Sequence, residues 1–325
     1  MQPLKIGILG YANIAKKAII PAIQENQYFN LYGVASRNTT NENEITQDLG
    51  CRFYNTYESM IEDATINALY IPLPNSLHFE WAKKALKQGK HLLVEKSLAC
   101  TLEDVNALNE LAKEKGLALI ENFQFRKHTQ LQAIKDLLAS KQIGEIRAVK
   151  SSFGFPPFSD QNNIRYQKDL GGGALLDAGA YPIKLAQELF GHNLDTTAAV
   201  LNYENTEVDI WGAGMLQDQN KSNFMQFSFG FDHHYQCSLE VWGSKGKLFT
   251  NRIFTAPPGY QPSLQVENKE GQKTISLETA NHYVNMLTHF YQCTQNIDLR
   301  NLEYKNNSNQ SRLLASFKNK AQINK

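Results

Sequence analysis

The stretch that decides the fold is Leu4-Lys5-Ile6-Gly7-Ile8-Leu9-Gly10-Tyr11-Ala12-Asn13-Ile14-Ala15. Residues 4–9 form a short apolar strand that ends at Gly10, and a helical pattern continues through Ile23. Where a strand turns directly into a helix, backbone N–H groups and the helix N-terminus can hold the pyrophosphate of a dinucleotide. We predict that this turn binds such a cofactor through Gly10, Tyr11, Ala12, Asn13 and Ile14.

The glycine fingerprint of such turns is incomplete in this chain. Where the pattern Gly-x-Gly-x-x-Gly has its three glycines, the chain has Gly10, Ala12 and Ala15. Alanine is small enough for close packing, but it adopts positive φ less readily than glycine. A tight strand–helix turn that holds no ligand is therefore the alternative interpretation.

The first third of the chain continues this alternation of strands and helices. The later predicted strands are Leu31–Ala35, Ala68–Ile71, His91–Val94 and Leu117–Ile120. The predicted helices are Phe79–Lys87 and Leu102–Lys115, and Thr101 and Asp104 are placed for the start of the second. Buried strands that alternate with helices predict a parallel sheet wound by right-handed crossovers.

After Arg126 the pattern changes to long β-like runs rich in aromatic and β-branched residues. These runs are Ile146–Phe155, Ala198–Tyr203, Asp209–Met215, Phe224–Phe231 and Tyr235–Trp242. Helical patterns accompany them at Gln130–Ala139, Gly171–Phe190, Ala280–Thr294 and Gln310–Lys318. The Asn-, Gln- and Lys-rich end of the chain is predicted to be a solvated tail.

We therefore predict an α/β protein with two domains, for which 325 residues are long enough. Residues 1–122 are expected to form an N-terminal Rossmann fold that binds a dinucleotide. Residues 123–325 are expected to form a C-terminal α/β domain with a large, mostly antiparallel open sheet that binds the substrate. The C-terminal helix is expected to pack back on the first domain.

Composition excludes several classes of partner. Hydrophobic residues make up 42% and charged residues 20% of the chain, and the formal net charge is +1. Without a basic excess or a long apolar run, neither nucleic acid nor a membrane is an expected partner. No leader pattern and no Cys-x-x-Cys pair occurs, so a cytoplasmic protein with reduced thiols is expected. No metal site is predicted, because adjacent His233 and His234 would point to opposite faces of a strand.

The end of the second strand predicts which dinucleotide is bound. An NAD-binding strand usually ends in Asp or Glu, which holds the ribose hydroxyls, whereas this one ends in Ala35-Ser36-Arg37-Asn38. The guanidinium of Arg37 can pair with a 2′-phosphate and stack on adenine, and the Ser36 hydroxyl adds a donor. We predict NADP(H) as the cofactor, with a solvated surface arginine as the alternative.

Further polar or loop residues follow three later strands, at the sheet edge where open parallel sheets bind ligands. They are Pro72, Leu73 and Asn75, then Glu95 and Lys96, then Glu121. Each alone fits a cap or a loop residue, but together they favour a cofactor site. Lys96 can orient a substrate and stabilise charge on a carbonyl oxygen, unless it is a surface lysine paired with Glu95.

A second informative run is Gly171–Pro182, GGGALLDAGAYP. Asp177 and Tyr181 share a face if this run is helical, because they are four residues apart. Pro182 disfavours α geometry at Tyr181, which predicts a kink that aims the phenol into a cleft. A tyrosine near a lysine can donate a proton to a carbonyl oxygen as hydride arrives. In the alternative interpretation Asp177 is a cap and Tyr181 a core aromatic.

Together these segments resemble the Gfo/Idh/MocA oxidoreductase family over nearly the whole chain. The resemblance is carried by the Gly10 turn, Ile71–Asn75 with His78, Glu95-Lys96-Ser97, Glu121 with Arg126, and Gly171–Pro182. It implies that Lys96, Asp177 and Tyr181 are catalytic and that His78 and Arg165 belong to the cofactor site. It also implies a homodimer or homotetramer formed through the sheet of the second domain.

The chain departs from the family pattern at three places. Ser97 replaces the proline of a Glu-Lys-Pro motif, which leaves the shape of that loop open. Ala12 and Ala15 replace glycines of the phosphate turn, and His128-Thr129 stands where many relatives have His-Pro.

Within the family, the chain resembles bacterial nucleotide-sugar C-3 ketoreductases of deoxysugar biosynthesis. This resemblance rests on Glu121–Arg126, Asn163–Asp177, Phe231–Tyr235 and Phe254–Pro258. The hypothesis is NADPH-dependent reduction of a sugar ketone, with the proton from Tyr181, the carbonyl polarised by Lys96, and Asp177 as a positioning residue. A dehydrogenase of free sugars, polyols or dihydrodiols, and a non-catalytic NADPH-binding sensor, are the alternatives.

Overall fold

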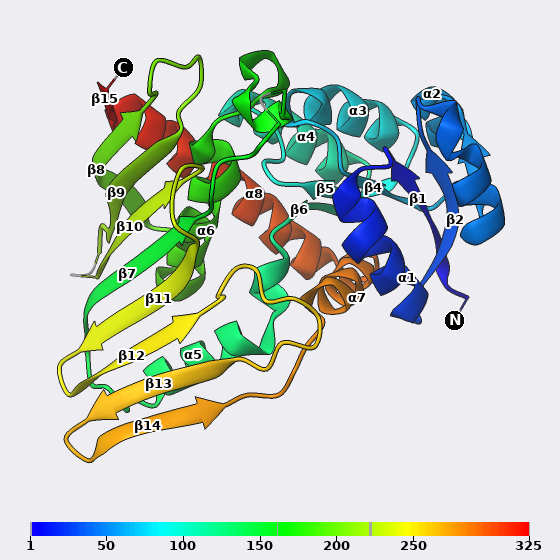
Figure 1. Ribbon diagram of the computed structural model, residues 1–325. Helices are drawn as coiled ribbons and strands as arrows, with labels where there is room; N and C mark the ends of the chain where they lie inside the picture. The colour runs from blue at the N-terminus through cyan, green and yellow to red at the C-terminus, as the bar shows by residue number, and fades with distance from the viewer. Residues whose placement is uncertain (1, 161, 221–222, 325) are drawn as a thin grey trace. The chain divides into compact units, whose positions relative to one another are not determined.

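The computed structural model describes residues 2–160, 162–220 and 223–324, which form two compact units (Figure 1). Unit 1 comprises Met1–Asn122 and Tyr283–Ser308, and unit 2 comprises Phe123–His282 and Asn309–Lys325. Residues 283–308 therefore complete unit 1, although they follow most of unit 2 in the sequence.

Unit 1 is built on a parallel sheet of six strands in the order β3-β2-β1-β4-β5-β6. The strands are β1 (Leu4–Leu9), β2 (Phe29–Ala35), β3 (Arg52–Tyr54), β4 (Ala68–Ile71), β5 (His91–Glu95) and β6 (Leu119–Asn122). The short β3 carries no strand pattern of its own and was not predicted. The strand order reverses between β1 and β4, which is the Rossmann arrangement and brings the carboxyl ends of the strands to one edge.

Helices connect these strands, and those after β1, β4 and β5 are predicted from the sequence, whereas the short helices between β2 and β4 are not. They are η1 (Ala15–Ile19), α1 (Ile20–Glu25), η2 (Thr39–Asn41), η3 (Glu44–Asp48), α2 (Tyr57–Glu62), α3 (Asn75–Lys87) and α4 (Leu102–Glu114). Residues 13–25 are helical without interruption, so η1 and α1 are one helix. The predicted cap of α4 is confirmed, because Oγ1 of Thr101 accepts a hydrogen bond of 3.1 Å from the Asp104 backbone N–H.

Unit 2 is built on a mixed sheet of nine strands in the order β14-β13-β12-β11-β7-β10-β9-β8-β15. The strands are β7 (Ile146–Gly154), β8 (Leu194–Asn202), β9 (Trp211–Asp218), β10 (Phe224–Gly230), β11 (Gln236–Gly243), β12 (Gly246–Asn251), β13 (Ser263–Asn268), β14 (Gly271–Ser276) and β15 (Gln322–Asn324). Only the β7–β10 and β8–β15 pairs are parallel within the part that the structure describes. The predicted fold class, with a mostly antiparallel open sheet, is confirmed.

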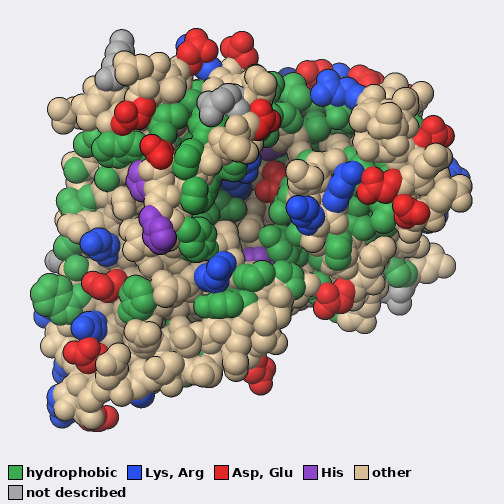
Figure 2. All heavy atoms as spheres, viewed as in Figure 1, with side chains coloured by type: hydrophobic (Ala, Val, Ile, Leu, Met, Phe, Trp, Pro, Cys, Tyr) green, Lys and Arg blue, Asp and Glu red, His purple; other side chains and the backbone are tan. Residues whose placement is uncertain are grey.

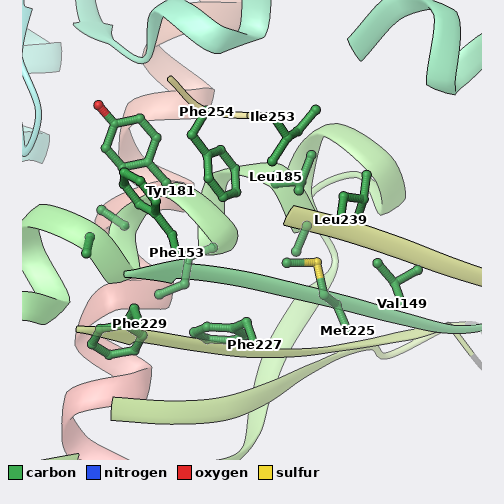
Figure 3. Close-up of a cluster of buried hydrophobic side chains, with 14 of the residues drawn as sticks. Val149, Phe153, Tyr181, Leu185, Met225, Phe227, Phe229, Leu239, Ile253 and Phe254 are labelled. Atoms are coloured by element: carbon green, nitrogen blue, oxygen red, sulfur yellow. The ribbon is translucent and has the colours of Figure 1, made fainter. Parts of the chain in front are cut away.

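Helices cover one face of this sheet (Figure 1). They are η4 (Gln124–Lys127), α5 (Thr129–Ala139), η7 (Leu175–Gly179), α6 (Ala180–Phe190) and the end of α8 (Ile297–Lys320). The short helices η5 (Ile164–Tyr166) and η6 (Lys168–Leu170) precede η7 in the chain. Figure 3 shows Phe227, Met225 and Leu239 of the strands in the apolar layer beneath Leu185 of α6. Along β11 the burial alternates, which places Trp242 on the opposite face with 64% of its surface exposed.

The C-terminal helices differ from their predicted extent. α7 (His282–Gln295) lies where the sequence predicts it, but α8 begins at Ile297 instead of Gln310. The first half of α8 is rich in Asn, which lowers helix propensity. Tertiary hydrogen bonds compensate, since Nδ2 of Asn307 donates to the Leu119 carbonyl at 3.0 Å and to Oδ1 of Asn109 at 3.1 Å.

The predicted solvated tail is also wrong in part. Gln322–Asn324 form β15, which adds to the edge of the unit 2 sheet beside β8. Across the described residues, no helix combines the length and the apolar character needed to cross a bilayer.

Candidate active site

The turn after β1 has the geometry of a phosphate-binding turn. Gly10 has a φ of +116°, and a Cβ atom there would lie 2.7 Å from Cδ2 of Leu73, so only glycine fits. Among residues 10–15, all of them described, positive φ occurs only at Gly10, so Ala12 and Ala15 keep ordinary backbone conformations. Ala12 also has no side chain that could cap the helix, which leaves N–H groups at its start for an anion.

Tyr11 is fixed beside this turn by Glu44. The Tyr11 hydroxyl donates to Oε1 of Glu44 at 2.7 Å, and Nζ of Lys16 lies 3.0 Å from Oε2 of the same carboxylate. Burial raises the pKa of Tyr11, and the carboxylate raises it further, so the phenol stays neutral. Asn13 and Ile14 occupy the first helical positions after the turn.

The loop after β2 offers a cation and no carboxylate. Arg37 is exposed, its guanidinium lies 5.8 Å from the ring centroid of Tyr57, and it forms no ion pair with any residue that the structure describes. The Ser36 hydroxyl is used within the loop, because it donates to the Asn38 carbonyl at 3.1 Å and accepts from Nδ2 of Asn41 at 2.9 Å. Ser36 therefore shapes the loop, and Arg37 is the group left for a 2′-phosphate.

A hydrogen-bonded network joins the carboxyl ends of β4, β5 and β6. Oε1 of Glu95 accepts hydrogen bonds of 2.6 Å from both the Tyr70 hydroxyl and Nδ2 of Asn122. Burial raises the pKa of Glu95, although these two donors and the charge of Lys96 oppose the shift. Glu95 therefore ties three strands together and stands next to Lys96 in the chain.

The loop that carries Lys96 is held by Glu121 and His78. The Lys96–Ser97 peptide is cis. Oε1 of Glu121 accepts a hydrogen bond of 3.0 Å from the Leu98 backbone N–H. The ring nitrogens of His78 lie 2.7 Å from two carbonyl oxygens, those of Ser97 and Leu73.

His78 contacts the backbone of two loops of unit 1, and its place in the cofactor site stays a prediction. Its side chain is fully buried, and both of its ring nitrogens face backbone carbonyls. It links the loop after β4 to the loop after β5 and so positions both. Pro72 and Leu73 are buried in the first of these loops, and Asn75 begins α3.

In unit 2, two predicted site residues form an ion pair. Nε of Arg165 lies 2.6 Å from Oδ2 of Asp177, and the Arg165 guanidinium carbon lies 4.8 Å from the ring centroid of Phe158. The Asp177 side chain is 15% exposed and that of Arg165 36%. The sequence assigns these residues to separate roles, whereas the structure joins them.

The start of the helix that carries Asp177 and Tyr181 is held by Asp209, a residue that the sequence analysis missed. Oδ2 of Asp209 accepts a hydrogen bond of 2.5 Å from the Leu175 N–H, and its backbone carbonyl accepts one of 2.7 Å from Ala174. Gly173 has a φ of +111°, and a Cβ atom there would lie 2.4 Å from Oδ1 of Asp209. Burial raises the pKa of Asp209 to about 6, although the backbone donors oppose the shift.

Tyr181 lies in a cage of four aromatic rings with its hydroxyl at the edge. Its ring centroid lies 5.1 to 5.9 Å from those of Phe123, Phe125, Phe153 and Phe254. Figure 3 shows the hydroxyl pointing away from this cluster. Residues 174–190 form one helix in which Tyr181 is α-helical, so the predicted kink at Tyr181 is wrong, and the helix widens instead one turn earlier, at Leu175–Gly179.

Behind Tyr181, a charged network ties α6 to η4 and α5. Glu188 accepts from Nε of Arg126 at 2.8 Å and from Nζ of Lys135 at 2.6 Å. Burial opposes ionisation of Glu188, but the two cations outweigh it and lower its pKa to about 2. Arg126 was noted from the resemblance, whereas Glu188 and Lys135 carry no local signal in the sequence.

The structure thus groups the predicted residues into two sets. Gly10, Arg37, Glu95, Lys96 and Glu121 lie at the strand ends of unit 1, and Asp177, Tyr181 and Arg165 lie around one helix of unit 2. The described part of the chain has no group of three or more His, Cys, Asp or Glu residues that could hold a metal ion. Figure 2 shows Lys, Arg, Asp and Glu interspersed on the visible face.

Two family models match the chain. The model described as the oxidoreductase family with an NAD-binding Rossmann fold, GFO/IDH/MocA, matches residues 4–123. The model of the GFO/IDH/MocA C-terminal domain matches residues 131–249. The first match spans the whole sheet of unit 1, and the second spans the unit 2 sheet from β7 into β12.

Curated proteins and solved structures agree with these matches. The chain is 38% identical over 272 residues to the dTDP-3,4-didehydro-2,6-dideoxy-alpha-D-glucose 3-reductase of Streptomyces violaceoruber, covering 83% of this chain and 79% of that protein. A protein of the same name from Actinomadura kijaniata is 36% identical, covering 90% of this chain and 87% of that one. The crystal structure of KijD10, a 3-ketoreductase from Actinomadura kijaniata in complex with NADP and TDP-benzene, has a TM-score of 0.94 at 33% identity and covers 99% of this chain and 98% of that one. The chain therefore belongs to the Gfo/Idh/MocA family of oxidoreductases.

Proposed function

We propose that this protein reduces the C3 keto group of a nucleotide-linked keto-deoxyhexose. Its class of activity is that of an NADP-dependent oxidoreductase acting on a sugar carbonyl, the class of relatives that match 83% and 90% of the chain. The observation that carries the proposal is the Tyr181 phenol, whose ring is fixed by four aromatic side chains while its hydroxyl stays at the edge of the cluster. A phenol whose ring is held in this way suits proton donation to a carbonyl oxygen.

NADP(H) is the cofactor, and the residues of unit 1 fit it. The Gly10 turn and the uncapped helix after it suit the pyrophosphate, and Arg37 suits the 2′-phosphate because β2 ends without a carboxylate. When bound in reduced form, this cofactor supplies the hydride. The chain's own residues then have to orient the ketone, exclude water and deliver a proton.

Lys96 is assigned to the carbonyl oxygen. Its ammonium group would stabilise the negative charge that develops there. The neighbouring Glu95 is engaged by Tyr70 and Asn122, and Glu121 and His78 hold the loop, so the backbone of Lys96 is fixed before substrate binds. Such preorganisation is what makes electrostatic stabilisation effective.

Asp177 and Arg165 are assigned to positioning. Their ion pair ties the π-type turn of the catalytic helix to η5, one turn before Tyr181. A carboxylate is an acceptor for the hydrogen bonds that sugar hydroxyls donate. We therefore assign Asp177 to the orientation of the sugar and not to proton transfer.

Assembly through the uncovered face of the unit 2 sheet is part of the proposal. Trp242 is 64% exposed on that face, and exposed aromatic side chains of this size are enriched at protein interfaces. A homodimer or homotetramer is expected in sedimentation experiments. Trp242→Lys should shift the protein toward monomer, and a wild-type protein that sediments as a monomer at micromolar concentration would argue against this assembly.

The proposed function is tested by NADPH consumption with two substrate panels. The first panel contains enzymatically generated nucleoside-diphosphate keto-deoxysugars, and the second contains free keto sugars and diketones. We expect turnover with the first panel, and its loss in Lys96→Met but not in Lys87→Met, since Lys87 is an exposed lysine of the same unit. Turnover confined to the second panel would favour a dehydrogenase of free sugars, and NADPH binding without turnover on either panel would favour a sensor.

A further inference from the structure

We propose that Arg252, held between Tyr235 and Tyr260, binds the diphosphate of a nucleoside-diphosphate substrate. This inference rests on the proposed function and identifies the residues that would distinguish a nucleotide-linked sugar from a free one. All three residues belong to unit 2, the unit that carries Tyr181. None of them belongs to the catalytic set predicted from the sequence.

The β11–β12 hairpin brings Tyr235 and Arg252 together. Ser238 of β11 pairs with Asn251 of β12, so the residues just before β11 and just after β12 meet at one end of the hairpin. Beyond that pair, the Ile253 N–H donates to the Cys237 carbonyl at 3.4 Å. The register of an antiparallel pair therefore fixes the relative position of the two side chains.

Most N–H donors of the Arg252 guanidinium have no hydrogen-bond partner among the described residues. Its central carbon lies 5.2 Å from the ring centroid of Tyr235 and 5.8 Å from that of Tyr260. Its hydrogen bonding within the described residues is limited to one long contact, 3.4 Å from Nη1 to the Tyr235 hydroxyl, and no described carboxylate lies within ion-pair distance. Arginine has five N–H donors arranged as a fork that fits phosphate oxygens.

The other arginines near Tyr181 differ in this respect. Arg126 is paired with Glu188, and Arg165 is paired with Asp177. Arg252 instead lies between two aromatic rings and remains half-exposed. A cation held between aromatic rings keeps its charge and is oriented without being neutralised. A charged and oriented guanidinium of this kind can bind an anionic ligand.

The backbone of Arg252 adds an independent observation. Its φ is +52°, a left-handed conformation that glycine and asparagine adopt more readily than arginine. Residues held in such conformations cluster at ligand-binding and active sites. Since no described ion pair explains an arginine here, the strained position points to a ligand.

The position of the cluster fits the geometry of the substrate. Phe254 follows Arg252 by two residues, and its ring centroid lies 5.5 Å from that of Tyr181. In a nucleoside-diphosphate sugar the sugar is joined directly to the diphosphate, so a diphosphate at Arg252 would bring the sugar ring toward Tyr181. Tyr235 is 37% exposed and offers a ring face on which the base can stack.

The phosphates of NADP(H) have the same chemistry as a substrate diphosphate. The Gly10 turn and Arg37 in unit 1 already account for the cofactor phosphates. The test therefore has to measure both ligands on the same variants. Binding of dTDP, thymidine and NADPH to the full-length protein is measured by titration calorimetry for wild type, Arg252→Gln and Arg252→Lys.

The proposal predicts a selective loss of dTDP binding. Arg252→Gln should weaken dTDP about 10- to 100-fold, the effect of losing hydrogen bonds to a charged group. Thymidine and NADPH should bind as in wild type, and Arg252→Lys should recover part of the affinity for dTDP. Arg147→Gln, which changes an exposed arginine of β7, should leave all three affinities unchanged.

A third variant separates binding from folding. Arg252→Asn suits the left-handed backbone, so its thermal midpoint should equal or exceed that of wild type while dTDP binding is lost. If wild type binds dTDP and Arg252→Gln binds it equally well, this inference is overturned and the proposed function stands. A parallel loss of thymidine or NADPH binding would also overturn it. If wild type binds no dTDP and reduces only free sugars, the proposed function itself is wrong.

Discussion

Nε of Arg165 lies 2.6 Å from Oδ2 of Asp177. A residue predicted to bind the cofactor and a residue predicted to act in catalysis therefore form an ion pair with each other. The pair is partly buried, so removal of either partner breaks an ion pair that is partly shielded from water. The two side chains should therefore act together on the orientation of the substrate.

A double-mutant cycle tests this coupling. Asp177→Asn and Arg165→Gln should each lower kcat/KM, and their interaction free energy should fall within about 0.5–3 kcal/mol. The control is a cycle between Asp177 and Lys135, since Lys135 is bonded to Glu188 instead. Additive effects of Asp177→Asn and Arg165→Gln would mean that the two residues act separately.

Tyr181→Phe should affect turnover and little else. The ring would stay in its aromatic cage, so the thermal midpoint and the Kd for NADPH should remain close to wild type. Loss of the proton donor should lower kcat about 10²- to 10⁴-fold. The control is Tyr203→Phe, which removes a phenol hydroxyl elsewhere in unit 2. Wild-type turnover in Tyr181→Phe, under conditions where chemistry is rate-limiting, would remove Tyr181 from the mechanism.

Arg37→Gln should reverse the preference between the two nicotinamide cofactors. Loss of a charged contact to the 2′-phosphate costs about 1.5–3 kcal/mol, so NADPH binding should weaken by roughly one to two orders of magnitude. NADH has no 2′-phosphate, and its Kd should not change. Arg52→Gln is a suitable control, because Arg52 is an exposed arginine of the same unit whose Nη1 lies 3.5 Å from Oδ2 of Asp63. Equal weakening of both cofactors would indicate that Arg37 only shapes the loop.

The stabilisation that ionised Glu188 contributes to the folded protein should be lost in acid. Its folded pKa of about 2 lies below the ordinary value of 4.5, so its stabilisation is present above pH 4.5 and is lost as the pH falls through 2. Between pH 4.5 and 3 the loss amounts to roughly 2 kcal/mol in the free energy of unfolding. In urea titrations Glu188→Gln should lack this slope, whereas Glu145→Gln, at an exposed ion pair, should retain it. Identical slopes in wild type and Glu188→Gln would contradict the assignment.

The contribution of Asp209 to the free energy of unfolding should change with pH in the opposite direction. Its folded pKa of about 6 lies above the ordinary value of 3.8, so its contribution is fully present below pH 3.8 and is lost as the pH rises through 6. The loss is on the order of 3 kcal/mol. Asp209→Asn should remove this decline, and Asp232→Asn, at an exposed position, should not. The measurement is the unfolding free energy at intervals between pH 4 and 7, and a decline that persists in Asp209→Asn would point to another group.

Local sequence patterns predicted the elements that contain strong periodicity. β7, β10 and β11 begin and end within one residue of the runs Ile146–Phe155, Phe224–Phe231 and Tyr235–Trp242, because inward and outward side chains alternate along them. The start of α8 was missed because its stabilising partners, Asn109 and Leu119, lie nearly two hundred residues away in the sequence. A single-sequence pattern carries no trace of such partners.

The same distinction applies to the site. Gly10, Arg37 and Lys96 could be proposed from the sequence because each follows a recognisable strand, at the edge where open parallel sheets bind ligands. Asp209 was missed because it is 34 residues from Leu175, the residue whose N–H it accepts. Arg126 and Glu188 are 62 residues apart, so their pairing also depends on tertiary structure alone.

The division of the chain into units has a consequence for engineering. Residues 283–308 close unit 1, and Asn307 bonds to the carbonyl of Leu119 in its sheet. A chimaera joined at residue 122 would therefore receive a nucleotide-binding half whose last strand has lost its hydrogen bonds with Asn307. To exchange cofactor specificity between relatives, the transferred sequence would have to include residues 283–308, from α7 and the first half of α8, together with the Rossmann sheet.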